Sequence, residues 1–217
     1  MALPTFARYG NVTGDFSIWD KMFNLYLFTA YQDPDGTGPG LWSPEYNLFY
    51  RDNTYFNKSS PNNLPVFWAR GNGWAIAAMA RAIAELPRFH PYAVEFATKL
   101  QLLAGSLKVL QGSDGLWRSN LLDSNEFPNP ETTGTSLFTF ALAWGVNNGL
   151  LVREEYENTI INAWNGLTTI SIQSNGLLGY CQPPNGQPAN ATSTDTSDFC
   201  VGQFLLAGSE LYKFYSM

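Results

Sequence analysis

The amino-acid sequence predicts an all-α protein with the architecture of an incomplete α/α toroid, and three observations lead to this prediction. Helical segments that are apolar on nearly every side alternate with segments that are apolar on one side, as in an inner ring of helices backed by an outer one. A glycine-leucine pair follows each outer segment, at Leu41, Leu116 and Leu177, with separations of 75 and 61 residues. Long irregular segments accompany these pairs. The pattern is that of repeated helical hairpins with all the long loops on one side.

The first elements are the end of one helix and a complete second helix. Residues 3–9 have helical spacing, and we expect that helix to stop near Gly10. Residues 16–31 carry one broad apolar face. The segment 33–65 is rich in Asp, Pro, Gly and Asn but holds many aromatic residues, which favours a functional loop over a disordered one.

The remaining elements repeat the alternation of inner and outer helices. Residues 68–86 form a helix that is apolar almost all round, and residues 91–110 form an amphipathic one. The same pair recurs as 131–144 and 153–172, and 199–215 is a final apolar helix. Six helices and the tail of a seventh cannot close a ring of paired helices, so the sequence predicts an arc.

The composition indicates a well-packed protein that handles neither nucleic acid nor membranes. Hydrophobic residues make up 45% of the 217, charged residues 14% and aromatic residues 15%. Such aromatic content is typical of carbohydrate-handling proteins, although a large aromatic core explains it equally well. The net charge is −6 without any cluster of Lys or Arg, which argues against a nucleic-acid partner. No apolar run reaches membrane-spanning length, which argues against a membrane partner.

Signals for the cellular compartment are few. No signal peptide is visible after Met1. Three glycosylation triplets, at Asn11, Asn57 and Asn190, favour an extracellular protein, although such triplets also arise by chance. We therefore expect an extracellular location.

The cysteines and the histidine exclude a familiar class of metal site. Cys181 and Cys200 are compatible with one disulfide in an oxidising compartment or with two buried thiols. His90 is the only histidine, so a Cys/His metal site is excluded and no cofactor is expected.

The stretch 67–74 is the first candidate for a ligand site. It places Trp68, Arg70 and Trp74 at the start of the most apolar helix. A guanidinium can fork onto a carboxylate and an indole can stack on the apolar face of a sugar, so the stretch suits an acidic, ring-shaped ligand. The alternative is a helix start with two core tryptophans and a surface arginine.

The long aromatic loop supplies further candidates. Trp42, Arg51 and Asp52 lie in it. An acidic protein needs local arginines to hold an acidic ligand, which adds weight to Arg51 as well as to Arg70.

Five segments together resemble one family of enzymes. The sequence is similar to the unsaturated rhamnogalacturonyl hydrolases of glycoside hydrolase family 105, close to the unsaturated glucuronyl hydrolases. The resemblance covers essentially the whole chain, and its motifs occur in the family's order. The matching segments are 68–74, 115–118, 131–138, 143–151 and 204–212.

The resemblance implies a fold and a reaction. The fold is an (α/α)6 barrel, of which residues 1–217 would be the C-terminal arc as a single domain, with about seven of twelve helices and the first one partial. The reaction is hydration of the 4,5 double bond of an unsaturated uronic acid at the end of oligosaccharides from rhamnogalacturonan or pectin lyases. An Asp protonates the double bond and activates water, so the chemistry is general acid/base catalysis rather than displacement by two carboxylates.

The resemblance also assigns roles to particular residues. Trp68, Arg70 and Trp74 would line the sugar site, with the arginine facing the uronate carboxylate. Arg51 stands where some members carry a histidine and would act as a second cation. From their positions alone, in the aromatic loop and at the start of an inner helix, Asp52 and Glu131 are further candidate sugar ligands, although a loop or helix-capping role is favoured for each.

The catalytic Asp of the family has no counterpart in this sequence. Residues 1–8 resemble the family segment that follows this Asp, so we expect the Asp upstream of Met1 and the chain to be truncated. Two alternatives remain, a non-catalytic carbohydrate-binding fragment or relic, and another α/α toroid such as a terpene cyclase, which the lack of Asp-rich metal motifs disfavours. An arc would expose an apolar edge, so we expect self-association.

Overall fold

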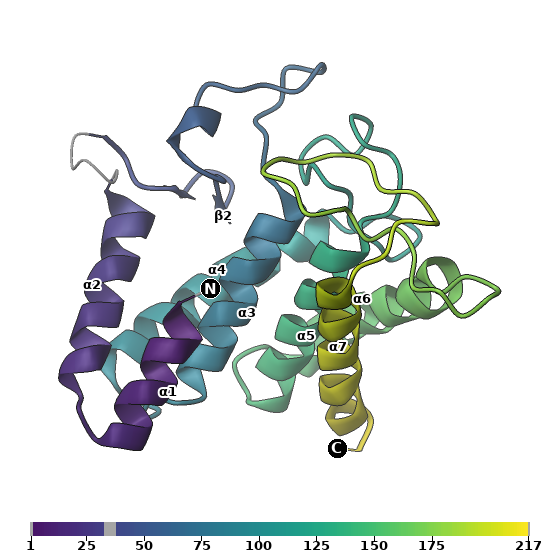
Figure 1. The fold of residues 1–217 in the computed structure, drawn as a ribbon. Helices are drawn as coiled ribbons and strands as arrows, with labels where there is room; N and C mark the ends of the chain where they lie inside the picture. The colour runs from purple at the N-terminus through teal and green to yellow at the C-terminus, as the bar shows by residue number, and fades with distance from the viewer. Residues whose placement is uncertain (1, 33–37, 217) are drawn as a thin grey trace.

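The computed structural model describes residues 2–32 and 38–216, so Met1 and the first residues of the expected aromatic loop lie outside the described residues. The described residues form seven α-helices in an arc with little β-structure (Figure 1). The helices are α1 (Leu3–Thr13), α2 (Ser17–Tyr31), α3 (Ala69–Ile83), α4 (Pro91–Val109), α5 (Thr132–Asn147), α6 (Arg153–Gly166) and α7 (Asp198–Ser216). The short elements are β1 (Trp42–Ser43), β2 (Leu48–Phe49), the 3-10 turn η1 (Asn53–Tyr55) and the π-helical turn η2 (Leu167–Ser171).

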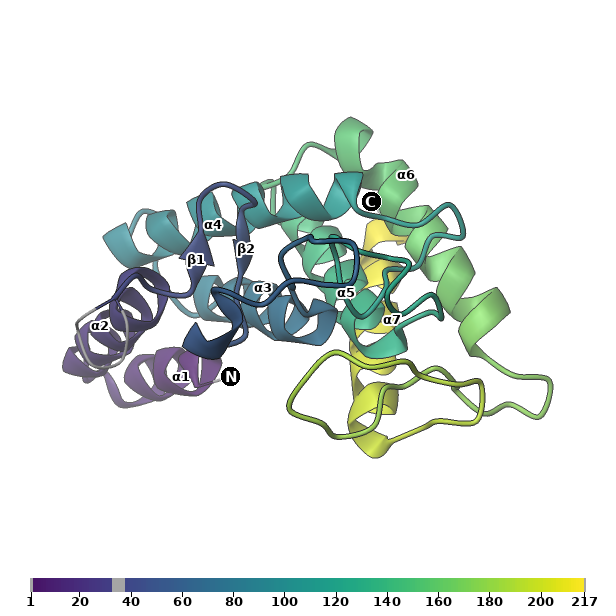
Figure 2. The same cartoon turned by 90° about the horizontal axis from the view of Figure 1, so that it is seen from above.

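The helices alternate between an inner and an outer layer, which confirms the predicted α/α toroid architecture. The odd-numbered helices pack in sequence, α1 on α3, α3 on α5 and α5 on α7, and the even-numbered helices back them (Figure 2). The α5 helix is buried on every side from Thr132 to Gly145, as expected for the centre of an inner layer. Gly134 allows α3 and α5 to meet closely, because a Cβ there would lie 2.9 Å from the Cβ of Ala69.

Two helix ends differ from those predicted. The expected stop at Gly10 is wrong, because α1 continues to Thr13 and ends at Gly14, whose φ of 72° gives a left-handed cap. Gly10 is glycine for packing, since an added Cβ would lie 2.6 Å from the ring of Trp19. The helix expected over 153–172 stays α-helical to Gly166 and then forms the π-helical turn η2.

The long connections lie on one side of the arc, as the sequence predicted (Figure 1). The first of them carries the β1–β2 hairpin, which a buried side chain ties to α3. Asn72 accepts a hydrogen bond from the Phe49 N–H at 2.8 Å and donates one to the Phe49 carbonyl at 3.0 Å. This amide thereby pairs with the backbone of β2 as a neighbouring strand would.

No helix in the described part of the chain is both long enough and apolar enough to cross a membrane. One helix nevertheless shows apolar residues to solvent. On α7, at one end of the arc, Leu205 is 63% exposed and Tyr212 is 78% exposed, and Val201 precedes them by one turn.

We expect this face of α7 to promote self-association, because covering exposed apolar residues at helical spacing lowers the free energy of the system. Leu205→Glu together with Tyr212→Glu should shift the sedimentation profile towards monomer at high concentration. The control is Val109→Glu, which changes an 83%-exposed residue at the end of α4. A wild-type chain that stays monomeric at the same concentration would contradict the prediction.

Candidate functional site

A cavity of about 640 Å³ lies between α1, α2, α3 and the loop that follows β2. This volume lies within the range of small-molecule sites and suits a short saccharide. The wall is mostly apolar and aromatic. It is formed by Ala2, Leu3, Leu25, Tyr26, Thr29, Leu41, Phe49, Tyr50, Arg51, Asp52, Trp68, Gly71, Trp74, Ala75, Ala78 and Met79.

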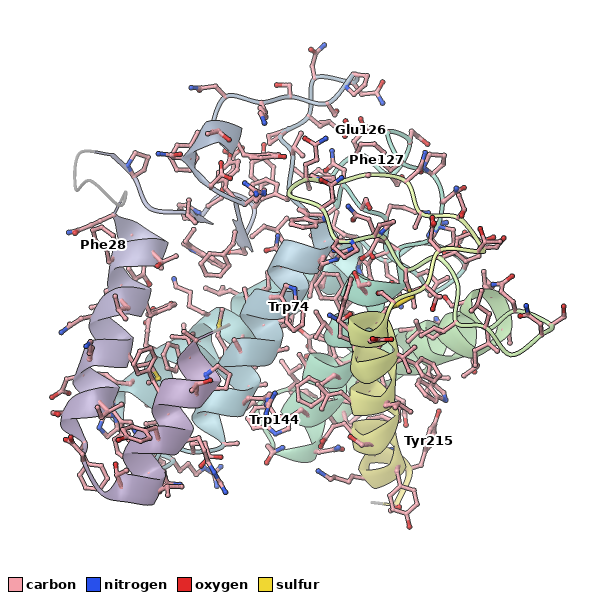
Figure 3. All side chains as sticks on the ribbon, viewed as in Figure 1. Phe28, Trp74, Glu126, Phe127, Trp144 and Tyr215 are labelled. Atoms are coloured by element: carbon pink, nitrogen blue, oxygen red, sulfur yellow. A yellow bond between two sulfur atoms is a disulfide. The ribbon has the colours of Figure 1, made fainter. Side chains whose placement is uncertain are left out.

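The two predicted tryptophans line this cavity together. Trp68 immediately precedes α3, and Gly71, Trp74 and Ala78 follow at intervals of three or four residues, so one helix face forms the wall. Figure 3 shows Trp74 on α3 in the middle of the arc. The indole N–H of Trp68 donates a hydrogen bond to Gln182 Oε1 at 2.9 Å, which fixes the plane of this ring.

Arg51 and Asp52 are the charged members of the wall among the described residues. They form an ion pair, and their side chains are 36% and 31% exposed. Asp52 also caps η1 by accepting a hydrogen bond from the Thr54 N–H at 2.9 Å. Arg51 thus stands at the cavity as a partly exposed cation, whereas both oxygens of Asp52 already accept hydrogen bonds.

Arg70 lies behind the wall and not in the cavity. It is 4% exposed, and its Nε donates to Thr133 Oγ1 at 2.9 Å. Its Nη1 and Nη2 each donate to the Pro183 carbonyl at 3.3 Å, and Nη2 also donates to the Gln182 carbonyl. In this arrangement the guanidinium donates to oxygens of the protein itself. The contact of Arg70 with a uronate stays a prediction, and it requires residues 182–183 to move.

The guanidinium of Arg70 is also enclosed by rings. Its Cζ lies 5.2 Å from the ring centre of Trp68 and 5.0 Å from that of Phe199. Burial lowers the pKa of Arg70 from its ordinary value, and the nearby Glu131 carboxylate opposes this shift. The site therefore keeps a buried cation close to a buried carboxyl group.

Glu131 is fully buried and caps α5. It accepts hydrogen bonds from the Gly134 N–H at 2.6 Å and from the Thr133 N–H at 3.1 Å. Thr133 connects it to Arg70, because its hydroxyl donates to Glu131 and accepts from Arg70. Of the two roles considered for Glu131, the geometry is that of a helix cap, and it does not line the cavity.

Trp42 belongs to β1 of the hairpin and does not line the cavity. Its ring meets that of Phe49 edge to face at 4.9 Å, and the Lys99 ammonium lies 4.6 Å from its centre. Trp42 thus stabilises the hairpin that precedes Arg51 and Asp52.

Several polar residues that position the site were missed from the sequence. Asn72 and Gln182 are fully buried, and Ser119 is nearly so. The Ser119 hydroxyl lies within hydrogen-bond distance of the Ala189 carbonyl at 2.6 Å and of Gln182 Oε1 at 3.2 Å. Asn72 lies inside the motif 68–74 on a helix that is apolar almost all round, so the sequence could have indicated that it is buried. Nothing in the sequence around Gln182 indicates its role.

Cys181 and Cys200 form a disulfide, which decides between the two alternatives left open by the sequence. Both are fully buried in a small apolar cluster with Leu178. No group of three or more metal-ligating His, Cys, Asp or Glu side chains occurs within 2–32 and 38–216.

Asp123 joins two of the loops above the arc. It is 3% exposed and accepts two hydrogen bonds from the Asn62 amide at 3.0 Å, and one from the Asn125 N–H at 3.3 Å. A hydrogen bond from Ser60 is the largest cause that lowers the pKa of Asp123. The carboxylate therefore has a structural role in the loops.

Asp123→Asn should destabilise the chain near neutral pH and have less effect in acid. A lowered folded-state pKa gives stability that is present above the unfolded-state pKa of about 4 and is lost as the pH falls through the folded-state value. Urea unfolding of wild type and variant between about pH 7 and pH 2 measures this. Glu154→Gln, at an exposed carboxylate of α6, is the control. An equal cost of Asp123→Asn at every pH would contradict the assignment.

Comparisons with known proteins agree with the fold. The model of the family described as Glycosyl Hydrolase Family 88 matches residues 1–215. Two curated relatives are both named Unsaturated 3S-rhamnoglycuronyl hydrolase. The one from Alteromonas sp. (strain LOR) is 38% identical over 171 residues, which cover 79% of this chain and 41% of the relative. The one from Formosa agariphila is 33% identical over 219 residues, covering 98% of this chain and 56% of the relative.

A solved structure shows the same arrangement of helices. The structure described as Glycosyl hydrolase family 88 from Bacteroides vulgatus superposes with a TM-score of 0.90 at 33% identity. The match covers 99% of this chain and 61% of the other. The chain spans about half the length of the curated relatives it matches.

Proposed function

Because this chain belongs to Glycosyl Hydrolase Family 88, we propose that it serves a glycoside hydrolase that acts on oligosaccharides ending in an unsaturated uronic acid. The names of the two curated relatives support this class of substrate. The observation that carries the proposal is the cavity, which joins two indole rings to a partly exposed guanidinium. The narrower assignment to family 105 and to rhamnogalacturonan or pectin products is part of this proposal.

The cavity residues have complementary roles in the proposed complex. Trp68 and Trp74 offer apolar rings for the faces of the sugars. Arg51 would turn from Asp52 to the uronate carboxylate, because a guanidinium can bind a carboxylate through two parallel hydrogen bonds. The acidic sugar thereby finds a cation inside a protein of net charge −6.

The proposed reaction is hydration of the 4,5 double bond. A general acid protonates the double bond, water adds to the resulting cation, and the hemiketal opens with release of the neighbouring sugar. Asp52 is poorly suited to be this acid, because both of its oxygens already accept hydrogen bonds, from Arg51 and from Thr54. That the general acid is an Asp outside residues 1–217 stays a prediction, and the coding sequence upstream of Met1 tests it.

A second candidate function is carbohydrate binding without catalysis. The engagement of Asp52, the carboxylate of the cavity wall among the described residues, favours it. The two functions separate in one assay, because a hydrolase removes the ultraviolet absorbance of the unsaturated uronate and a binding module leaves it unchanged.

Trp74→Ala should weaken the binding of unsaturated digalacturonate by about tenfold or more, because a stacking surface worth at least ~1.4 kcal/mol is lost. Calorimetric titration measures the dissociation constant. Tyr212→Ala, at an aromatic residue of α7 outside the cavity, is the control and should bind as wild type does. Equal affinity of Trp74→Ala and wild type would remove the cavity from the proposal.

We also propose an extracellular location. Disulfides persist in oxidising compartments, and Cys181 and Cys200 are bonded. Asn57 and Asn190 of the glycosylation triplets are exposed. Quantification of free thiols in the protein as secreted by its native host tests this, since two free thiols would contradict it.

A further inference from the structure

The segment between the two bonded cysteines, residues 182–199, forms a closed loop that we call the strap. Its ends are joined by the Cys181–Cys200 disulfide. Figure 1 shows this segment, between α6 and α7 in yellow-green, crossing above the ends of α3 and α5. The backbone before the strap is fixed as well, because the Thr132 N–H at the start of α5 donates to the Tyr180 carbonyl at 2.9 Å.

The strap contacts three of the residues that the sequence placed in the site. Gln182 Oε1 accepts the indole N–H of Trp68 at 2.9 Å. The carbonyls of Gln182 and Pro183 accept hydrogen bonds from the Arg70 guanidinium. Gly186 lies against Arg51, since a Cβ at Gly186 would lie 2.9 Å from Arg51 Nη2.

Gln182 is the residue through which the strap acts on the cavity. Its side chain is fully buried, and both its oxygen and its nitrogen make hydrogen bonds. The oxygen accepts from Trp68 and is within 3.2 Å of the Ser119 hydroxyl, and the nitrogen donates to the Gln187 carbonyl at 2.6 Å. Because both its oxygen and its nitrogen are bonded, the Gln182 amide has one orientation. Its oxygen therefore accepts from the Trp68 indole N–H at one fixed position.

We propose that Gln182 is a positioning residue that fixes the Trp68 indole as a wall of the cavity, and that the Cys181–Cys200 bridge keeps Gln182 in place. Arg70 contributes from below, because it clamps the carbonyls of Gln182 and Pro183 while its guanidinium packs on the Trp68 ring. Loss of the bridge would let the strap leave Trp68 without unfolding the helices. The inference rests on the proposed function only in taking Trp68 as a wall that faces a saccharide.

The experiment follows hydrogen exchange of assigned indole N–H groups in the ¹⁵N-labelled chain. Trp117 is the internal reference, because it is fully buried and its indole N–H donates to the Leu107 carbonyl of α4 at 2.9 Å. Gln182→Met removes the acceptor at similar volume. Gln182→Glu keeps an acceptor for the indole but loses the donor to the Gln187 carbonyl. Gln101→Met removes an exposed amide of α4 that donates to the Leu150 carbonyl at 2.8 Å.

Gln182→Met should speed exchange at Trp68 by about tenfold or more and change it at Trp117 by less than about twofold, because the strap opens locally. Gln101→Met should leave exchange at Trp68 near the wild-type rate, and Gln182→Glu should speed it by less than Gln182→Met does. Unchanged exchange at Trp68 in Gln182→Met would overturn the proposal. Equal acceleration at Trp68 and Trp117 would also overturn it, since the substitution would then act through global stability.

The role of the bridge is tested by removing it in two ways. Dithiothreitol gives two electrons and two protons to the disulfide, becomes its own cyclic disulfide, and leaves Cys181 and Cys200 as thiols. The Cys181→Ala, Cys200→Ala double variant removes the bridge without reductant. Both should speed exchange at Trp68 and spare Trp117. Wild-type exchange at Trp68 in the double variant would overturn the part assigned to the bridge.

Binding gives a second readout that a purely structural role would not move. Calorimetric titration with unsaturated digalacturonate should show about threefold or greater weakening in Gln182→Met and a smaller weakening in Gln182→Glu. Equal affinities of the two variants would remove the effect on the cavity. If the wild-type chain gives no heat with this saccharide, the proposed function fails, while indole exchange still decides whether Gln182 positions Trp68.

Discussion

Arg70→Met is expected to lower the free energy of unfolding by about 3 kcal/mol or more, because it removes a buried cation while leaving its partners buried. The guanidinium donates four hydrogen bonds, one to Thr133 Oγ1, one to the Gln182 carbonyl and two to the Pro183 carbonyl. Methionine fills a similar volume without donating, so the carbonyls lose their partners and the Glu131 carboxyl group loses its nearby positive charge.

Denaturant unfolding measures this loss, and the same helix supplies the control. Arg81 is an exposed arginine on α3, so Arg81→Met should change stability by less than about 0.5 kcal/mol. Similar losses for the two variants would contradict the buried role of Arg70. The alternative role, a direct contact with the uronate, predicts instead that Arg70→Met remains as stable as wild type and loses affinity for the acidic sugar.

Glu131→Ala is expected to cost about 2 to 3 kcal/mol of folding stability, because the start of α5 loses its cap where no water can replace it. The Gly134 and Thr133 N–H groups would be left without acceptors inside the protein. Asp52→Ala removes a cap from the partly exposed turn η1, and it should cost about 1 kcal/mol or less.

Thermal or urea unfolding of the two cap variants tests the effect of burial. If Asp52→Ala lowers the free energy of unfolding as much as Glu131→Ala does, burial of the α5 cap is not the reason for the large effect of Glu131→Ala. The Arg70→Met, Glu131→Ala double variant should cost less than the sum of the single variants, because the two groups share Thr133 and interact.

The helices were predictable because each one buries a face at regular spacing. The apolar run from Ala75 to Ala80 identified α3 as an inner helix, and α5 was apolar enough to be read as buried. The stop at Gly10 was mispredicted because glycine serves equally as a helix end and as a place where a ring packs. Only the position of Trp19 decides between these two uses.

The wall of the cavity was predictable for the same reason, and the network behind it was not. Trp68 and Trp74 share one face of α3, so their common orientation follows from local geometry. Arg70 meets Gln182 across 112 residues of sequence, and no local pattern reports such a pairing. The motif 68–74 therefore identified residues near the cavity. It did not show that Arg70 faces the strap instead of the cavity.

The closed strap has a consequence for proteolysis. Residues 183–187 are exposed, and they lie between two cysteines that are covalently joined. A protease that cuts there produces a nicked molecule whose two pieces migrate together on a non-reducing gel and separate when the bridge is reduced. Because Gln182 stays on the piece that carries Trp68, a nicked chain can keep the hydrogen bond to the Trp68 indole, whereas the bond from Gln182 to the Gln187 carbonyl then joins the two pieces.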